Sequence, residues 1–147
     1  IAKEYGADYC INYSQNEFKD KVKEYTNGKG ANIIYDPVGG DVFNQSLRCI
    51  AWNGIILVIG FASGTIASAP TNLPLLKNCS IVGVFWGAWR EREPHGHNVN
   101  MEKILKWWKE NKVKPKVSKV FNLEDTKYAL QALVNREVIG KAVIKIK

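Results

Sequence analysis

The sequence predicts an α/β fold built on parallel strands, because segments typical of strands and of helices alternate along the whole chain. A continuous apolar run at residues 55–59 (IILVI) is typical of a strand that is buried on both faces, as parallel strands are. Of the 147 residues, 46% are hydrophobic and 11% aromatic, which supplies a core and argues against disorder. We therefore expect a folded α/β domain.

The first elements are expected to be a helix end, a strand and a second helix. Residues 1–6 fit the last turn of a helix that stops at a glycine, and residues 7–12 (ADYCIN) fit a short buried strand. Ser14 and Glu17 have the spacing of a capping box, in which each side chain bonds the backbone N–H of the other residue. Apolar positions at helical spacing then predict a helix over residues 18–26.

Two strands with glycine-rich exits follow. Residues 31–35 (ANIIY) predict a strand, and the Asp-Pro-Val-Gly-Gly run at 36–40 ends it. A helix is predicted over residues 42–50. The apolar strand leaves through a loop at residues 60–64 (GFASG), and a further strand is predicted at 80–85.

The last third of the chain continues the alternation. Residues 90–97 are rich in charge and predict a loop, and residues 101–108 predict a strongly apolar helix. Residues 117–121 predict a strand and residues 125–136 a helix. Residues 140–147 alternate apolar side chains with lysines, as a half-exposed strand does.

The net charge of +7 raises the question of an anionic partner. The lysines are scattered along amphipathic segments, which is typical of solvated faces. No basic stripe with interleaved aromatic residues tracks a phosphate backbone, so we expect no nucleic-acid partner. A moderately basic surface would also suit an anionic dinucleotide.

Three cysteines, Cys10, Cys49 and Cys79, lie far apart in apolar runs and are expected to be free thiols. The sequence contains no Cys-x-x-Cys pair, and a reducing cytoplasm is the expected location. No apolar run approaches the roughly 18 residues of a membrane span, so we expect no membrane partner.

Five blocks of sequence stand in a recognisable order. They are INY at residues 11–13, YDPVGGDVFNQSL at 35–47, GIILVIGFASG at 54–64, SIVGVFWG at 80–87 and VIGKAVIKI at 138–146. Together they resemble the zinc-independent quinone oxidoreductases of the medium-chain dehydrogenase/reductase superfamily, whose blocks have the same order and spacing.

The resemblance implies a two-domain enzyme of which this chain is a C-terminal fragment. Residues 1–114 would be a partial Rossmann, dinucleotide-binding domain without its first strands. Residues 115–147 would return to the GroES-like catalytic domain. The chain has no Gly-x-Gly-x-x-Gly turn to bind the pyrophosphate, and it starts at Ile1 rather than at Met. In the strand order 3-2-1-4-5-6 the strand at 7–12 would be the third, so we expect a gap in the sheet beside it.

The resemblance also places cofactor-binding residues on the first two strand exits. Tyr13 would lie near the phosphates on the adenosine side, although a loop tyrosine that only packs is an equal alternative. Val38 and Gly39 would lie against the ribose, at the carboxyl end of a parallel strand where ligands of such sheets bind. A plain turn whose glycine supplies a positive φ is the alternative there.

The nicotinamide end is expected at the next two strand exits. Gly60 and Phe61 would bring backbone and an apolar ring to the nicotinamide. Val84, Phe85 and Trp86 would approach its carboxamide through backbone groups, while Trp86 could instead be a core or interface aromatic.

No residue of the chain is assigned a catalytic or metal-binding role. His95 and His97 could face one metal ion, but no third ligand accompanies them, so a solvent loop is expected. The resemblance implies NADP as cofactor, with NAD as the alternative.

The parent protein is expected to transfer hydride from NADPH to a quinone or similar conjugated carbonyl, with the fragment alone inactive. Two alternatives remain at this stage. One is an enoyl- or acryloyl-thioester reductase of the same superfamily. The other is a non-catalytic module that dimerises through the strand at residues 80–85, as family members pair that strand.

Overall fold

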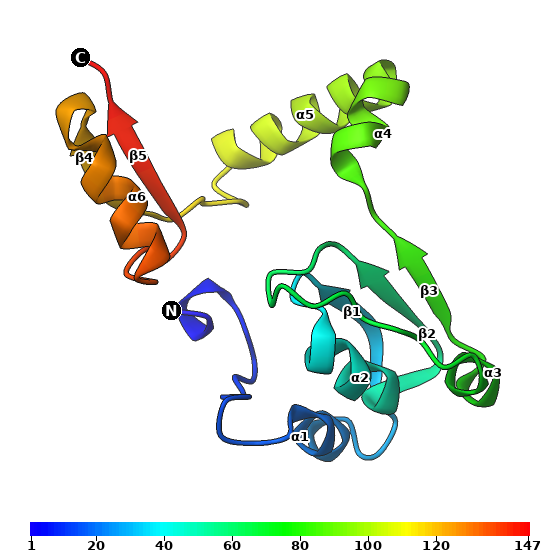
Figure 1. Ribbon diagram of the computed structural model, residues 1–147. Coiled ribbons are helices and arrows are strands. Elements are labelled where there is room, and N and C mark those ends of the chain that lie inside the picture. Colours follow the sequence, from blue (N-terminus) through cyan, green and yellow to red (C-terminus); the bar gives the residue numbers. More distant parts are fainter. The chain divides into compact units, whose positions relative to one another are not determined.

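The computed structural model describes all 147 residues, which form two compact units, Ile1–Gly87 and Ala88–Lys147. The elements of the first unit are η1 (Lys3–Tyr5), α1 (Phe18–Tyr25), β1 (Ala31–Asp36), α2 (Gly40–Cys49), β2 (Ile50–Val58), α3 (Asn72–Lys77) and β3 (Ser80–Gly83) (Figure 1). α4 (Trp86–Arg92) runs across the division, and α5 (Pro94–Lys109), β4 (Val117–Asn122), η2 (Leu123–Asp125), α6 (Thr126–Val134) and β5 (Lys141–Lys145) follow. The predicted alternation and parallel sheet are confirmed.

The first unit is built on a three-stranded parallel sheet in the order β1-β2-β3 (Figure 1). β2 is longer than predicted, because it begins at Ile50. Its pairing with β1 is irregular between Ile50, which is opposite Ala31, and Ile55, which is opposite Ile33. Asn53 within that irregularity has a left-handed φ of 60°. Residues 52–54, directly before the apolar run, therefore form a distortion inside the strand.

The core of the first unit lies between α2 and one face of the sheet. Phe43 and Leu47 of α2 pack with Ile50 and Ile56 of β2, and Leu47 and Ile56 are both fully buried. The other face is less covered, since Ile55 remains 37% exposed. The expectation of burial on both faces is therefore met on the α2 side and not on the other.

Helix α2 is held by a glycine at its N-terminal end and by a lysine at its C-terminal end. Gly39, with φ 71°, turns the chain into the helix. At the other end the Nζ atom of Lys77 donates hydrogen bonds to the carbonyl oxygens of Arg48 (3.1 Å) and Ile50 (2.9 Å). A cation here satisfies carbonyls that have no partner within the helix and opposes the negative end of its dipole.

The segment at residues 7–12 is not a strand, which corrects the sequence-based expectation. A strand needs a partner for its backbone groups, and none of the five strands pairs with this segment. Tyr9 instead stacks on Tyr25 of α1 with ring centroids 4.1 Å apart. The expected gap is consequently absent from the sheet, whose three strands are contiguous and in which β1 is an edge strand.

Two local expectations were also wrong. Helix α1 begins at Phe18 with Glu17 as its N-cap, so Glu17 does not stand three residues inside the helix as a capping box requires. The backbone N–H of Ser14 bonds the Asn12 side chain instead. The charged stretch at residues 90–97 is helical rather than a loop, because α4 extends to Arg92 and α5 starts at Pro94, a residue favoured in the first helical turn.

In the second unit, β4 and β5 pair in parallel, and α6 lies between them in the chain. Ala129 and Ala132 of α6 are its buried residues, with exposures of 4% and 5%. Small side chains at these positions let the helix approach the two strands closely. The expected strands and helix of this region are confirmed.

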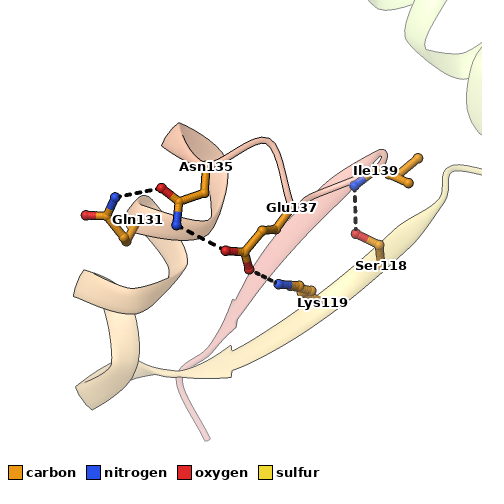
Figure 2. A network of polar contacts seen from close by, with 6 residues as sticks. All are labelled: Ser118, Lys119, Gln131, Asn135, Glu137 and Ile139. Atoms are coloured by element: carbon orange, nitrogen blue, oxygen red, sulfur yellow. Dashed lines mark hydrogen bonds and ion pairs between the residues drawn. The ribbon is translucent and has the colours of Figure 1, made fainter.

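A polar network closes the turn from α6 into β5 (Figure 2). The carboxylate of Glu137 accepts hydrogen bonds from Lys119 Nζ (2.6 Å) and Asn135 Nδ2 (3.1 Å), and Gln131 bonds Asn135 in turn. The Ile139 N–H donates to the Ser118 hydroxyl (3.2 Å). The hydrogen bonds from Lys119 and then Asn135 hold the pKa of Glu137 below its ordinary value of 4.5.

This network predicts an acid-sensitive contribution to stability. Because the folded-state pKa is lowered, the Glu137 carboxylate stabilises the second unit above about pH 4.5 and loses that effect as the pH falls through its folded-state pKa. Glu137→Gln is expected to lower the thermal unfolding temperature slightly at neutral pH, and the difference should vanish in acid. The exposed Glu124 gives the control Glu124→Gln, and an equal pH profile for both variants would contradict the prediction.

Candidate nucleotide crevice at the sheet edge

The candidate site lies where the three parallel strands of the first unit end. Asp36 of β1 is level with Val58 of β2, which is level with Gly83 of β3. Strands that run in the same direction end at the same edge, so the loops that follow them converge. This edge is the place where ligands of doubly wound sheets bind.

The loop from β1 to α2 is fixed by a buried aspartate. Asp36 is 2% exposed, and its Oδ1 atom accepts the backbone N–H groups of Val38 (2.8 Å) and Gly39 (3.0 Å). Asp is favoured at such turns because its side chain can bond its own backbone two residues on. Gly39 and Gly40, with φ values of 71° and 55°, then adopt conformations that other residues rarely reach.

The loop after β2 is joined to this first loop. Ala62 and Ser63 donate their N–H groups to the carbonyl oxygens of Pro37 and Val38, both at 3.0 Å. Gly39 is so close to Phe61 that a Cβ on Gly39 would stand 2.7 Å from the Phe61 ring. The two glycine-containing loops therefore form one joined structure along the sheet edge.

An apolar pocket of about 350 Å³ opens beside these loops, and its wall is formed by the ends of β2 and β3. Four predicted site residues line it, Gly60, Phe61, Val84 and Phe85, together with Val58, Ile59 and Gly83. None of these side chains is ionisable. The pocket therefore offers aromatic and aliphatic surface and backbone groups, which suits a flat, uncharged ring.

One of the two backbone polar groups of Val84 is hydrogen-bonded to β2. Its N–H donates to the Val58 carbonyl at 3.0 Å, which leaves the Val84 carbonyl as its free polar group. Phe85 is 79% exposed and Phe61 is 41% exposed, so both rings can reach a ligand at the pocket.

The remaining predicted residues do not share this pocket. Val38 and Gly39 belong to the joined loops beside it, as described above. Tyr13 lies 56% exposed in the turn before α1, and Trp86 begins α4 with 53% of its surface exposed. The structure thus brings six of the eight predicted residues to one edge, and the roles assigned to all eight stay predictions.

Sequence reasoning missed two features of the site. Ile59 and Gly83 line the pocket, and their places directly before Gly60 and Val84 could have indicated this. Asp36 was noted only as part of the run that ends the strand, although an aspartate three residues before a Gly-Gly pair is typical of a side-chain-bonded turn.

A second cavity, of about 380 Å³, is polar and lies along the outer side of α2. Its lysine, Lys19, is paired with Glu17, whose hydrogen bond raises the pKa of Lys19. Asp41 accepts a hydrogen bond from Gln45 at 2.9 Å. Lys19 and Asp41 therefore have partners within the cavity, whereas the buried Oε1 atom of Gln45 has none.

Other candidate chemistry receives no geometric support. No group of three His, Cys, Asp or Glu side chains is placed to hold a metal ion. Cys49 is 1% exposed, and burial raises the pKa of its thiol, which makes it a poor nucleophile. None of the helices has the length and apolar character that a membrane-spanning segment requires.

The parallel sheet, its covering helix and the crevice at its carboxyl edge define a Rossmann-like α/β protein. A sequence model of the family described as zinc-binding dehydrogenase matches residues 1–107. The chain belongs to that family, within the medium-chain dehydrogenase/reductase superfamily, as its sequence blocks predicted.

Relatives and solved structures agree with this assignment. The chain is 47% identical over its whole length to the quinone oxidoreductase-like protein 2 homolog of Nematostella vectensis, and covers 40% of that protein. The crystal structure of an NAD-dependent alcohol dehydrogenase matches 99% of the chain, which covers 40% of that structure, with a TM-score of 0.82 and 28% identity. A mycobacterial protein complexed with NADPH has the same fold, with a TM-score of 0.86 and 23% identity. The match covers 99% of the chain and 46% of the mycobacterial protein.

The chain spans about 40% of the length of the curated relatives it matches. The residues present fit one end of a dinucleotide better than the other. The apolar pocket and the glycine-containing loops suit a flat ring and its sugar, whereas the chain has no Gly-x-Gly-x-x-Gly turn of the kind that binds a pyrophosphate.

Proposed function

We propose that the whole protein is an oxidoreductase that transfers hydride from NADPH to a quinone or a similar conjugated carbonyl. The observation that carries this proposal is the apolar pocket at the carboxyl edge of the sheet, lined by Gly60, Phe61, Val84 and Phe85. The names of the similar relatives, quinone oxidoreductase-like proteins, support the reaction class.

In this proposal the pocket receives the nicotinamide ring and the joined loops beside it receive the ribose. When bound, the cofactor supplies the hydride chemistry, and the protein orients it and excludes water. Phe61 and Phe85 would flank the ring with apolar surface. The Val84 carbonyl is the backbone group available to the carboxamide N–H, since the Val84 N–H already bonds Val58.

The finer assignments are part of the same proposal. Tyr13 would lie on the adenosine side and Trp86 beyond the carboxamide. Residues 1–114 would belong to the dinucleotide-binding domain and residues 115–147 to the catalytic domain. We assign the protein to the cytoplasm, and we propose zinc-independent hydride transfer on the resemblance to zinc-independent quinone oxidoreductases.

The test is a cofactor-oxidation assay on the whole protein. NADPH and NADH are each mixed with quinones, enones and enoyl thioesters, and the loss of reduced nicotinamide absorbance is followed. We expect NADPH oxidation with quinones or enones, faster than with NADH and unaffected by removal of metal ions with a chelator. No oxidation with any quinone or enone would refute the proposal, and preference for thioesters would favour the enoyl reductase alternative.

A second candidate is a dimer formed through β3, with or without catalysis. β3 pairs with β2 on one side only, so its other edge presents unpaired backbone groups that a second copy could continue. Sedimentation of the whole protein is expected to show a homodimer. A monomer at all concentrations would rule out this assembly, and a dimer that binds no dinucleotide would favour the non-catalytic module.

A further inference from the structure

Asp36 is the one carboxylate that the fold buries. It is 2% exposed, and the other buried polar residue is the uncharged Ser46. None of the ion pairs of the structure includes Asp36. Burying a charge is costly unless hydrogen bonds compensate for the lost water, so the groups that bond Asp36 matter for the local structure.

Those groups belong to the loop beside the pocket. The Asp36 Oδ1 atom accepts the N–H groups of Val38 and Gly39 at 2.8 and 3.0 Å. Hydrogen bonds to a charged acceptor are about twice as strong as neutral ones. The N-terminus of α2 begins directly after this loop, at Gly40, and its positive end also favours a negative charge nearby.

The contacts continue from this loop to the pocket. The carbonyl of Val38 accepts the Ser63 N–H at 3.0 Å, and Gly39 lies against the Phe61 ring. Asp36 also acts through its backbone, because its carbonyl accepts the Ile59 N–H at 2.9 Å, directly before Gly60. One buried residue therefore bonds the first loop and the end of β2 at once.

We propose that Asp36 is a positioning residue of the cofactor site, which rests on the function proposed above. Its carboxylate holds the loop of Val38 and Gly39, and this loop in turn holds Phe61 at the mouth of the pocket. Asp36 does not touch the reacting atoms. Its effect on hydride transfer passes through the loops it fixes.

The alternative is that Asp36 contributes to folding alone. The two roles differ in what its loss changes: a purely structural residue alters the unfolding temperature, whereas a positioning residue also alters cofactor affinity in protein that is still folded. Asp36→Ala removes both hydrogen bonds. Asp36→Asn keeps an oxygen of the same geometry without the charge, and so should restore part of the effect.

The experiment uses the whole protein with Asp36→Ala and Asp36→Asn. The control is Asp41→Ala, which removes an exposed aspartate that bonds the Gln45 side chain and not the loop of Val38 and Gly39. NADPH dissociation constants are measured by fluorescence. Amide hydrogen exchange is measured without cofactor. We expect Asp36→Ala to weaken NADPH binding about tenfold or more, and to speed exchange at Val38, Gly39 and Ser63. Asp36→Asn should give a smaller change, and Asp41→Ala none.

Unchanged NADPH affinity and exchange in folded Asp36→Ala protein would overturn the proposal, as would an equal effect of Asp41→Ala. If Asp36→Ala does not fold, the same two measurements on Asp36→Asn decide. Failure of the proposed reaction would give a different result: the wild-type protein would bind NADPH but would not oxidise it with any of the acceptors. Binding and exchange need no acceptor, so they still test the role of Asp36 in that case.

Discussion

Replacing Leu47 with alanine is expected to lower the free energy of unfolding of the first unit by roughly 2–5 kcal/mol, the range for buried Leu-to-Ala changes. Leu47 is fully buried between α2 and the sheet, where it packs with Phe43, Ile50 and Ile56. Shortening it removes apolar contacts and leaves a cavity. The opening free energy of β2, read from native-state hydrogen exchange in the whole protein, measures the effect.

Leu75→Ala is the matched control for this change. It removes the same atoms from a leucine of α3 that is 79% exposed, so a change within about 0.5 kcal/mol is expected. Equal losses in the two variants would contradict the position of the core between α2 and the sheet.

Replacing Gly39 with alanine is expected to abolish or strongly weaken NADPH binding. Gly39 has φ 71°, which an alanine adopts only with strain, and the new Cβ would stand 2.7 Å from the Phe61 ring and 3.0 Å from the Thr65 carbonyl. Relief of this clash must move Phe61 or the loop that follows β2. Both belong to the proposed nicotinamide end, so we expect affinity to fall about tenfold or more, with a stability cost of about 1–3 kcal/mol.

Gly64→Ala separates the two causes. Gly64 has a similar φ of 79°, but no atom lies within 4 Å of the position of its Cβ. It therefore reports the strain of a positive φ without the clash. Titration of both variants with NADPH should show a larger loss for Gly39→Ala, and equal losses would mean that contact with Phe61 is unimportant.

The alternation of elements could be predicted from local patterns. The apolar run within β2, the helix α2 and the glycine-rich exits after β1 and β2 each carry their signal within about ten neighbouring residues. Parallel strands end at a common edge, so Gly60 and Val84 could be placed together in advance. The family resemblance supplied the roles proposed for them.

The sequence by itself therefore determined the fold class, the five strands and most of the helices, and the edge of the sheet that carries the candidate site. The tertiary structure decided what depends on distant partners. Residues 7–12 have the composition of a strand but find no strand to pair with. The loop after Asp36 is held by the N–H groups of Ala62 and Ser63, which lie far along the chain and bond the carbonyl oxygens of Pro37 and Val38. Local sequence sets what a segment can form, whereas hydrogen-bond partners and burial, which come from elsewhere in the chain, decide what it does form.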